Sequence, residues 1–545
     1  MKICGSLIVL AALLEGATAQ PRMAIAPIGS SKLDPALEQM LMLRSDPRHA
    51  HLARRLDPRP LSGATGGGER LSENEDMVPI IVSGDVHRED VVRAVNGIIG
   101  SRHGAILTAE VPADSLRPLA ARPGIVAVEA SRQLHPSLLH SVPSTGAHVM
   151  HAQSDPVRRL TGKGVIIGFT DSGINTPHAT FRAADGRTRI LSVWDQHGTG
   201  TPPSGWSYGA EHDSAEINGS RWWMYDLAEH GTHVAGIAAG NGRPGGTYTG
   251  MAPEADIIMV CNRGDDLWSG GLTTVGTLDG YDYIRSRANA LGKRHVINTS
   301  QGTNLGPHDG TSLFEQAIDA DIRAGSVVCL AAGNDALSGR HASAVVPSGG
   351  AVEIRFSFHT LFPQDTAAIP MEAWYSGGDR ISVSCRKEAD PSFAPSVPPG
   401  SSGLLTFDSV EVVFTNMVHS PLNGDNVIRC TLLPLVPVTE GDIAMVLRFE
   451  AADNGSLPDG GRIDLWWERN FEVAFLDHRD DACTIGMPGG ARGAITVGSC
   501  DNDAGAAGAL SVFSAHGPAR DGALKPDIVA PGGGVTSSVP GGGFR

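Results

Sequence analysis

The chain has 545 residues, of which 41% are hydrophobic and 19% are charged, and its formal net charge at pH 7 is −16. This length has room for several domains, because single domains typically have about 100–200 residues. The composition is that of a globular protein and excludes wholesale disorder. The negative charge and the lack of any Lys/Arg cluster argue against a nucleic-acid partner, since phosphate binding needs clustered cations.

The first 19 residues have the pattern of a secretory signal peptide. Lys2 supplies a positive start, residues 7–14 an apolar core, and Ala17-Thr18-Ala19 the small residues of a cleavage point. A membrane anchor is the alternative, but the apolar run is too short to span a bilayer and no later segment is a transmembrane candidate. We therefore expect a secreted or periplasmic protein. Export permits disulfides, but the cysteines after the signal are too widely spaced to define a pairing or a zinc site.

Two different segments follow the signal. Residues 20–76 are rich in Pro, Arg, Gly and Ser and show little periodicity, so we expect a flexible leader. Residues 77–135 alternate strand-like runs with helical spacing in the order β-α-β-α-β. That order predicts a small α+β domain with helices on one face of a sheet.

From residue 160 short apolar strands alternate with helices. The strands are expected at residues 165–170, 257–260, 296–299 and 327–332, and the helices at 281–291 and 312–324. Continuous apolar strands with crossover helices predict an α/β domain whose parallel sheet has helices on both faces. Sites in such sheets form at the carboxyl ends of the strands. We expect this domain to occupy residues 160–344 and 481–545.

Between residues 345 and 480 the hydrophobic period changes to two and helical spacing disappears. Pro- and Gly-rich turns separate the strand-like runs in this part of the chain. The pattern is typical of a β-sandwich. We therefore predict a jelly-roll-like sandwich inserted inside the α/β domain.

Three polar side chains have settings suited to nucleophilic catalysis. Asp171 follows a buried strand, so packing can hold its carboxylate rigidly. His230 precedes a run of small residues that suits a helix packed tightly against the sheet. Asn334 follows a strand and two small residues, and its side-chain N–H could point at a developing oxyanion. An alcohol nucleophile needs such a base, and the base needs an acid to fix its tautomer.

Each of these residues has an ordinary interpretation when taken alone. Asp171 could cap a turn, and Asn334 could be a simple turn residue. His230 and His233 could bind a metal, but an i, i+3 spacing without the Glu-bearing zincin pattern is weak evidence. We predict no metal site.

Taken together and in this order, the segments resemble the subtilisin-like serine proteases. The acid motif is Asp171-Ser-Gly-Ile-Asn, the base motif is His230-Gly-Thr-His-Val-Ala-Gly, and the oxyanion motif is Ala-Ala-Gly-Asn334. The resemblance implies peptide-bond hydrolysis in which Asp171 orients His230, His230 acts as general base and Asn334 helps to bind the oxyanion. It also places Ser300, Gln301 and Gly302 on the strand that binds substrate.

The resemblance carries further expectations about partners. The substrate is a polypeptide, and residues 77–135 correspond to an inhibitory propeptide that binds its own protease. No cofactor is implied; relatives often bind calcium, but no loop here locates such a site. The inserted sandwich is similar to the arrangement in clostridial germination proteases and their Bacteroidetes relatives.

The family's nucleophile motif, Gly-Thr-Ser-Met-Ala-x-Pro, is not found in the 545 residues. We therefore expect an α/β domain that is incomplete at its C-terminus and a product that is inactive as it stands. Gly310-Thr-Ser312 is a decoy, because Ser312 and Glu315 have the spacing of a helix capping box. The alternative is a non-catalytic pseudoprotease that binds a peptide or partner. The intact acid, base and oxyanion motifs argue against it, since binding alone needs none of them.

Two departures from the family pattern bear on the chemistry. Glu229 stands beside His230, and a carboxylate there could raise the pKa of the base. Gln301 stands at a commonly apolar position of the substrate strand, where it could change the polarity of the pocket.

Overall fold

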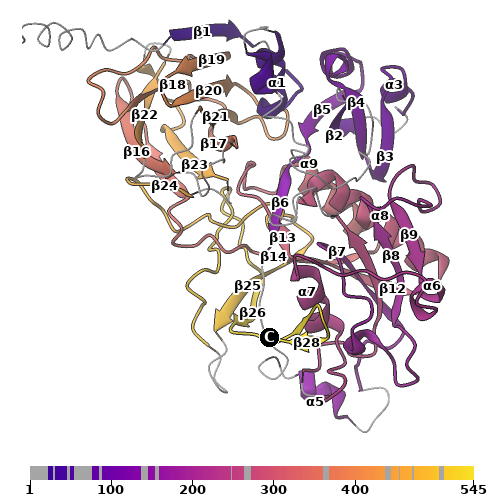
Figure 1. The fold of residues 1–545 in the computed structure, drawn as a ribbon. Coiled ribbons are helices and arrows are strands. Elements are labelled where there is room, and N and C mark those ends of the chain that lie inside the picture. Colours follow the sequence, from indigo (N-terminus) through magenta and orange to yellow (C-terminus); the bar gives the residue numbers. More distant parts are fainter. Residues whose placement is uncertain are drawn as a thin grey trace, which may run out of the picture.

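The computed structural model describes residues 22–28, 31–45, 49–53, 77–84, 89–136, 145, 147–153, 159–246, 248–262, 272–359, 367–435, 443–452, 455–468, 472–501 and 508–545. The predicted signal segment, residues 1–19, lies outside them. The described elements form three neighbouring regions (Figure 1): a small N-terminal unit, a sandwich of strands beside it, and a larger α/β region below both.

An eight-stranded sheet forms the centre of the α/β region. Its order is β26-β25-β14-β12-β7-β10-β8-β9, and all neighbours are parallel except β8 and β9. The strands are β7 (Val165–Asp171), β8 (Ile190–Asp195), β9 (Ala210–Asp213), β10 (Asp256–Cys261), β12 (Arg294–Thr299), β14 (Val327–Ala331), β25 (Ile495–Asp501) and β26 (Ile528–Gly533).

Helices cover both faces of this sheet. Helices α8 (Thr274–Ala290) and α9 (Leu313–Arg323) pack on one face, and α7 (His230–Ala239) packs on the other. Successive residues of a strand point to opposite faces. Ile166 of β7 accordingly lies in the core with α8 and α9, whereas Phe169 of the same strand lies in the core with α7. The predicted α/β fold is confirmed.

Helix α8 begins earlier than the sequence pattern indicates. We expected a helix from residue 281, but α8 starts at Thr274 because the hydroxyl oxygen of Thr273 accepts a hydrogen bond from the amide of Gly276 at 3.1 Å. Small and polar residues in the first turns of this helix hide the apolar period.

Residues from His341 to Phe475 form the inserted sandwich. A seven-stranded sheet, in the order β1-β19-β20-β21-β17-β23-β15, faces a four-stranded sheet in the order β18-β22-β16-β24. Apolar side chains from both sheets, including Phe356, Phe414 and Trp467, fill one shared core. The inserted strands are β15 (His341–Val345), β16 (Ala351–His359), β17 (Ile369–Tyr375), β18 (Ile381–Lys387), β19 (Ser401–Thr406), β20 (Val410–Met417), β21 (Asn426–Pro434), β22 (Ile443–Ala451), β23 (Arg462–Trp467) and β24 (Glu472–Phe475). The predicted inserted β domain is confirmed, and its first strand begins before the expected boundary at residue 345.

The leader is not simply flexible, contrary to expectation. Strand β1 (Arg22–Pro27) is the edge strand of the seven-stranded sheet and pairs antiparallel with β19. Helix α1 (Pro35–Ser45) follows it and packs between the sandwich and the N-terminal unit. Backbone pairing at a sheet edge needs no side-chain alternation, so the leader's composition concealed this strand. The rest of the expected leader, residues 54–76, lies outside the described residues.

Gln39 fixes helix α1 to the sandwich. Its side-chain amide donates hydrogen bonds to the carbonyl oxygens of Val413 (3.2 Å) and Arg429 (3.0 Å). Its side-chain oxygen accepts a hydrogen bond from the hydroxyl of Thr431 at 2.8 Å. Gln39 is completely buried, so these bonds satisfy polar atoms that water cannot reach.

Residues 77–130 form the N-terminal α+β unit. Its sheet has the order β3-β4-β2-β5 and lies on α8 and α9 by one face. Helices α1, α3 (Glu89–Arg93) and α4 (Leu116–Ala120) cover the other face. The strands are β2 (Met77–Gly84), β3 (Ile98–His103), β4 (Ile106–Pro112) and β5 (Ile125–Ala130).

Several polar contacts join this unit to the α/β region, and two of them involve the start or the middle of a covering helix. Asp279 of α8 accepts a hydrogen bond from the hydroxyl of Thr108 at 2.6 Å. At the start of α9, the amide of Leu313 donates to the carboxylate of Glu129 at 2.8 Å. The N-terminal unit therefore supplies an acceptor for an amide in the first turn of α9, which has no acceptor within the helix.

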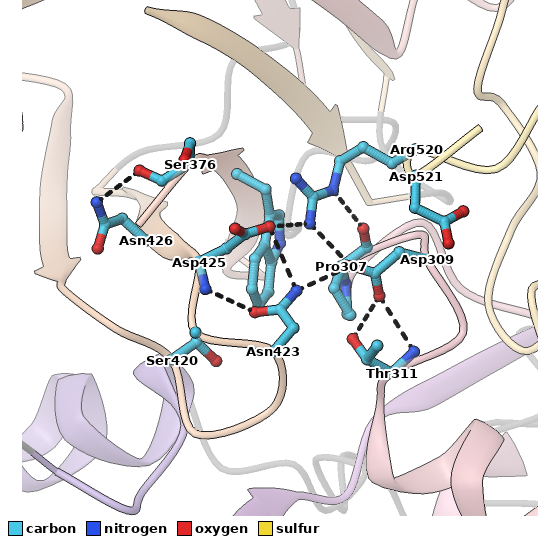
Figure 2. Close-up of polar contacts among 12 residues, drawn as sticks. Pro307, Asp309, Thr311, Ser376, Ser420, Asn423, Asp425, Asn426, Arg520 and Asp521 are labelled. Carbon is cyan, nitrogen blue, oxygen red and sulfur yellow. Dashed lines mark hydrogen bonds and ion pairs between the residues drawn. The ribbon is translucent and has the colours of Figure 1, made fainter. Parts of the chain in front are cut away.

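A partly buried arginine anchors the sandwich to the α/β region (Figure 2). The guanidinium of Arg520 donates to the carbonyl oxygen of Pro307 (2.7 Å) and the carboxylate of Asp309 (2.8 Å), which precede the insert in the chain. It also pairs with Asp425 in the insert. Asn423 bridges the same group by donating to Asp309 at 2.8 Å. Segments before, within and after the insert thus meet at one cation.

Candidate active site

The structure brings Asp171 and His230 together. Asp171 is the last residue of β7 and His230 the first residue of α7, and both side chains are buried. Nδ1 of His230 lies 2.6 Å from Oδ1 of Asp171. The amide of Ser172 donates to the same carboxylate oxygen at 2.7 Å. The carboxylate is therefore fixed from its own strand end and can hold the imidazole in one orientation.

The start of α7 is fixed to the turn after β7. The hydroxyl of Ser172 accepts from the amide of Gly231 (2.9 Å) and donates to the carboxylate of Asp226 (2.9 Å). Asp226 also accepts from the amide and the hydroxyl of Thr232, each at 2.8 Å. A Cβ on Gly231 would lie 2.2 Å from the carbonyl oxygen of Gly173, so no side chain fits there. Asp226, the carboxylate that accepts from the first turn of this helix, was not predicted from the sequence.

The residue before the base has a strained backbone. Glu229 has a φ of 62°, in the left-handed region, which costs a non-glycine residue roughly 1–2 kcal/mol. From the sequence, the carboxylate of Glu229 was a candidate for raising the pKa of His230. In the structure that carboxylate forms an ion pair with Arg545.

The second ring nitrogen of His230 is left without a partner. Its Nε2 is buried and makes no hydrogen bond to any of the residues that the structure describes. His233, three residues further along the helix, has its Nε2 at 3.3 Å from the carbonyl oxygen of Arg545. The two histidines therefore point to different partners, and the described residues contain no group of three or more metal-ligating side chains.

The predicted substrate strand lies beside a strand that directly follows the N-terminal unit in the chain. Strand β13 (Gln301–Gly302) pairs antiparallel with β6 (Gln133–Pro136), which pairs on its other side with β11 (Leu272–Thr273). Ser300 immediately precedes β13. Strand β6 thus forms the middle of a three-stranded sheet whose outer strands belong to the α/β region.

Gln301 connects the substrate strand to the acid. Its side-chain amide donates to the carbonyl oxygen of Thr170, the residue before Asp171. It also lines a pocket next to β13. The pocket is lined by Gln301, Gly302, Asn304, Ala331, Ala332, Gly333, Asp335 and Gly486. The link to Thr170 was not predicted, because a sequence does not show where a side chain points.

Asn334 lies at the edge of this pocket. It follows β14 in a turn in which Gly333 has a φ of 112°, and both of its neighbours line the pocket. Asn334 itself is half-buried and is not among the lining residues. Asp335, which we did not predict, is a buried carboxylate of the pocket and pairs with Arg340 at 3.0 Å.

The described serines near these elements have structural partners. Ser312 is the N-cap of α9, as predicted, because its hydroxyl accepts from the amide of Glu315 at 3.2 Å. The Glu315 carboxylate accepts from that hydroxyl at 2.7 Å rather than from the Ser312 amide, so the capping box is not the reciprocal one that we expected. The hydroxyls of Ser537 and Ser538 donate to backbone carbonyls of α7 at 2.8 and 3.0 Å. Ser514 accepts from the amide of Ser499 at 2.9 Å.

The sandwich holds the loop that follows β13. The carboxylate of Glu468 accepts from the hydroxyl of Thr303 and from the amide of Asn304 at 3.3 Å. The ring of His308 stacks on Trp466 of the sandwich with centroids 4.0 Å apart. Asn304 lines the pocket, so the insert supports one wall of it. No local sequence pattern indicates such contacts.

Comparisons with known proteins identify the lineage. Residues 162–361 and 451–543, more than half of the chain, match the model of the subtilase family, Peptidase_S8. The chain is 29% identical over 189 residues to subtilisin of Bacillus sp. (strain TA39), covering 35% of this chain and 38% of that protein. It is 27% identical over 245 residues to the serine protease AprX of Bacillus subtilis (strain 168), covering 44% of this chain and 47% of that protein.

A solved structure matches over a larger part of the molecule. The CspB protease of Clostridium perfringens is 26% identical and superimposes with a TM-score of 0.63, covering 74% of this chain and 82% of that one. The two relatives named above are matched over less than half of their own length. The chain belongs to the subtilase family of serine proteases.

Proposed function

We propose that this chain carries the acid, the base and the substrate cleft of a serine endopeptidase. The supporting observation is the buried Nε2 of His230, which has no partner among the described residues while Nδ1 is bound to Asp171. Leaving a buried polar atom unpaired costs about 1–3 kcal/mol. A histidine kept in that state is suited to accept a proton from an incoming group.

The mechanism follows from this geometry. Asp171 accepts the Nδ1–H of His230 and so leaves the lone pair on Nε2. Nε2 removes the proton of a serine hydroxyl as its oxygen attacks the substrate carbonyl carbon, and the proton then passes to the leaving amine. The side-chain amide of Asn334 would help to stabilise the oxyanion. The serine of this proposal is not among the 545 residues.

Residues 77–135 would act as an intramolecular inhibitor. Strand β6 lies between β11 and β13, the position of a substrate strand in this proposal. A bound polypeptide adds itself to a sheet by the same backbone pairing. The N-terminal unit, which packs on α8 and α9, holds β6 in this position.

We further propose that the protein is exported through residues 1–19. None of the helices that the structure describes is long and apolar enough to cross a membrane. N-terminal sequencing of the exported protein should begin at Gln20.

The test of catalysis joins the chain to a segment that carries the family's Gly-Thr-Ser-Met-Ala-x-Pro motif and exposes it to a serine-directed phosphonate. We expect covalent labelling of that serine, and loss of labelling in His230→Ala. His233→Ala, on the same helix, is the matched control and should be labelled normally. A folded protein that is not labelled would favour the non-catalytic, peptide-binding alternative.

A further inference from the structure

Arg132 extends the strand that occupies the cleft. Its amide donates to the hydroxyl of Thr274 at 3.0 Å, and its carbonyl oxygen accepts from the amide of Thr274 at 2.9 Å. These bonds continue the pairing of β6 with β11 by one residue. Arg132 therefore occupies a substrate-like backbone position, four residues before Pro136.

The side chain of Arg132 reaches the inserted sandwich. Nη1 lies 2.9 Å from Oε1 of Glu372 on β17, and both side chains are at least 95% buried. Glu129 and Asp34 lie further from the guanidinium, at 3.5 and 3.6 Å, and come from the N-terminal part of the chain itself. Glu372 is thus the carboxylate that the rest of the protein provides to this arginine.

Glu372 is held in place by groups other than Arg132. Its Oε1 also accepts from Arg429 at 2.7 Å, and its Oε2 accepts from the amide of Gly306 at 2.9 Å and from the ring N–H of Trp374 at 3.2 Å. Burial alone would raise the pKa of this carboxyl, but Arg132 and Arg429 hold its pKa below the usual value. The carboxylate keeps its position and a counter-charge when Arg132 leaves.

The anchor at Arg520 supports the same group. Its guanidinium lies over the ring of Trp374, 5.8 Å from the centroid, and Trp374 donates to Glu372. Gly306, the other donor to Oε2, belongs to the loop after β13 that the sandwich holds. The acceptor is therefore fixed relative to the cleft from two sides, as a binding site requires.

We propose that Glu372 forms a subsite of the cleft that binds an arginine four residues before the substrate residue aligned with Pro136. The inference rests on the proposed function, because it takes β6 to occupy the place of a substrate. Arg132 fills the subsite in the present structure. Polypeptides with an arginine at this position are the preferred substrates, and the insert contributes directly to specificity.

The test uses two fluorescent peptides and the full chain with Arg132→Ala, which empties the subsite. One peptide has the sequence of residues 129–136, and the other has citrulline in place of the arginine, which keeps the shape and removes the charge. The chain's own strand competes equally with both peptides. The ratio of the two dissociation constants therefore reports on the subsite alone.

We expect the arginine peptide to bind at least tenfold more tightly than the citrulline peptide. Adding Glu372→Gln should reduce this preference to less than threefold, whereas adding Glu353→Gln, an exposed carboxylate of the other sheet, should leave it unchanged. Equal affinities for the Arg132→Ala chain would overturn the subsite. This comparison needs no change in the sandwich, so a folding defect of the Glu372 variant cannot obscure it.

The outcome is independent of catalysis. Binding is measured without hydrolysis, so a failure of the proposed chemistry leaves the ratio unaffected. If neither peptide binds at any concentration reached, the cleft itself is misassigned, and the subsite is rejected with it.

Discussion

Two buried groups of charges in this molecule are built differently. At the end of β7, Asp171 and His230 form a single pair in which one ring nitrogen has no partner among the described residues. Where the leader, the N-terminal unit and the sandwich meet, Arg132 and Arg429 share Glu372, with further carboxylates nearby. The first group leaves the ring nitrogen that would accept a proton unpaired, as a reacting base must. The second balances two cations with several carboxylates, as expected of a charged contact that holds or recognises a chain. Single nitrogen and oxygen atoms in it also lack a hydrogen bond within the described part of the chain.

The largest effect is expected when the acid is removed from the pair of Asp171 and His230. In the form that carries the nucleophile segment, Asp171→Asn should lower kcat on the order of 10⁴-fold, because the imidazole loses the acceptor that fixes its tautomer. Peptide hydrolysis measures this loss. Asp185→Asn, an exposed aspartate of the same region, is the control and should retain activity. Equal rates for both variants would show that the pair is structural.

Substitution of Glu372, the carboxylate shared by Arg132 and Arg429, should lower the stability of the protein. Glu372→Ala leaves two buried arginines without their shared carboxylate, and breaking a buried ion pair costs about 3–5 kcal/mol. The free energy of unfolding in urea measures the loss. Glu353→Ala, on an exposed position of the sandwich, should cost less than about 1 kcal/mol. If both variants lost a similar amount of stability, the ion pairs of Glu372 would contribute nothing beyond its place in the strand.

The stability of the protein should also depend on pH through Glu129, a carboxyl group near Arg132. Burial raises the pKa of Glu129 from 4.5 to about 7, against the opposing effect of Arg132. Because the folded form holds the proton more tightly, this contribution to stability is complete below pH 4.5 and is lost as pH rises to about 7. Its size is about 3 kcal/mol.

Unfolding free energies between pH 4.5 and 7 test this dependence. The wild-type chain should lose stability across the interval, and Glu129→Gln, which carries no titrating proton, should lose less. A stability that rises with pH equally in both proteins would contradict the assignment.

The smallest expected effect concerns the leader. Gln39→Ala removes a side chain that makes three buried hydrogen bonds to the sandwich, and unsatisfied partners cost about 1–3 kcal/mol. Ser45→Ala, at the exposed end of the same helix, should change stability by less than about 0.5 kcal/mol. Thermal unfolding compares the two variants. If both variants unfold at the same temperature, the contact of helix α1 with the sandwich does not contribute to stability.

The sequence predicted the sheet, the insert and the pairing of Asp171 with His230 because their signals are local. Each of these two residues adjoins an apolar strand or a run of small residues, and the order of the motifs is fixed. The N-cap at Ser312 was predicted for the same reason.

The contacts that the sequence did not reveal join distant positions. Gln39 bonds to Thr431, and Arg132 pairs with Glu372, so no window of the sequence contains both partners. The leader was misjudged because its strand depends on an edge supplied by β19. Gln301 was noted as a polar residue of the pocket, but its hydrogen bond to Thr170 depends on a rotamer that only the packed structure defines.

The pairing of the leader with the sandwich has a consequence for biosynthesis. The partner positions Gln39 and Thr431 are 392 residues apart. Ribosomes add about 5–20 residues per second, so helix α1 emerges on the order of 20–80 s before the surface it covers. For that interval the beginning of the chain has no native partner in the sandwich. Helix α1 can therefore pack on the sandwich only after the strands around Thr431 have been synthesised. The leader takes its place late in folding.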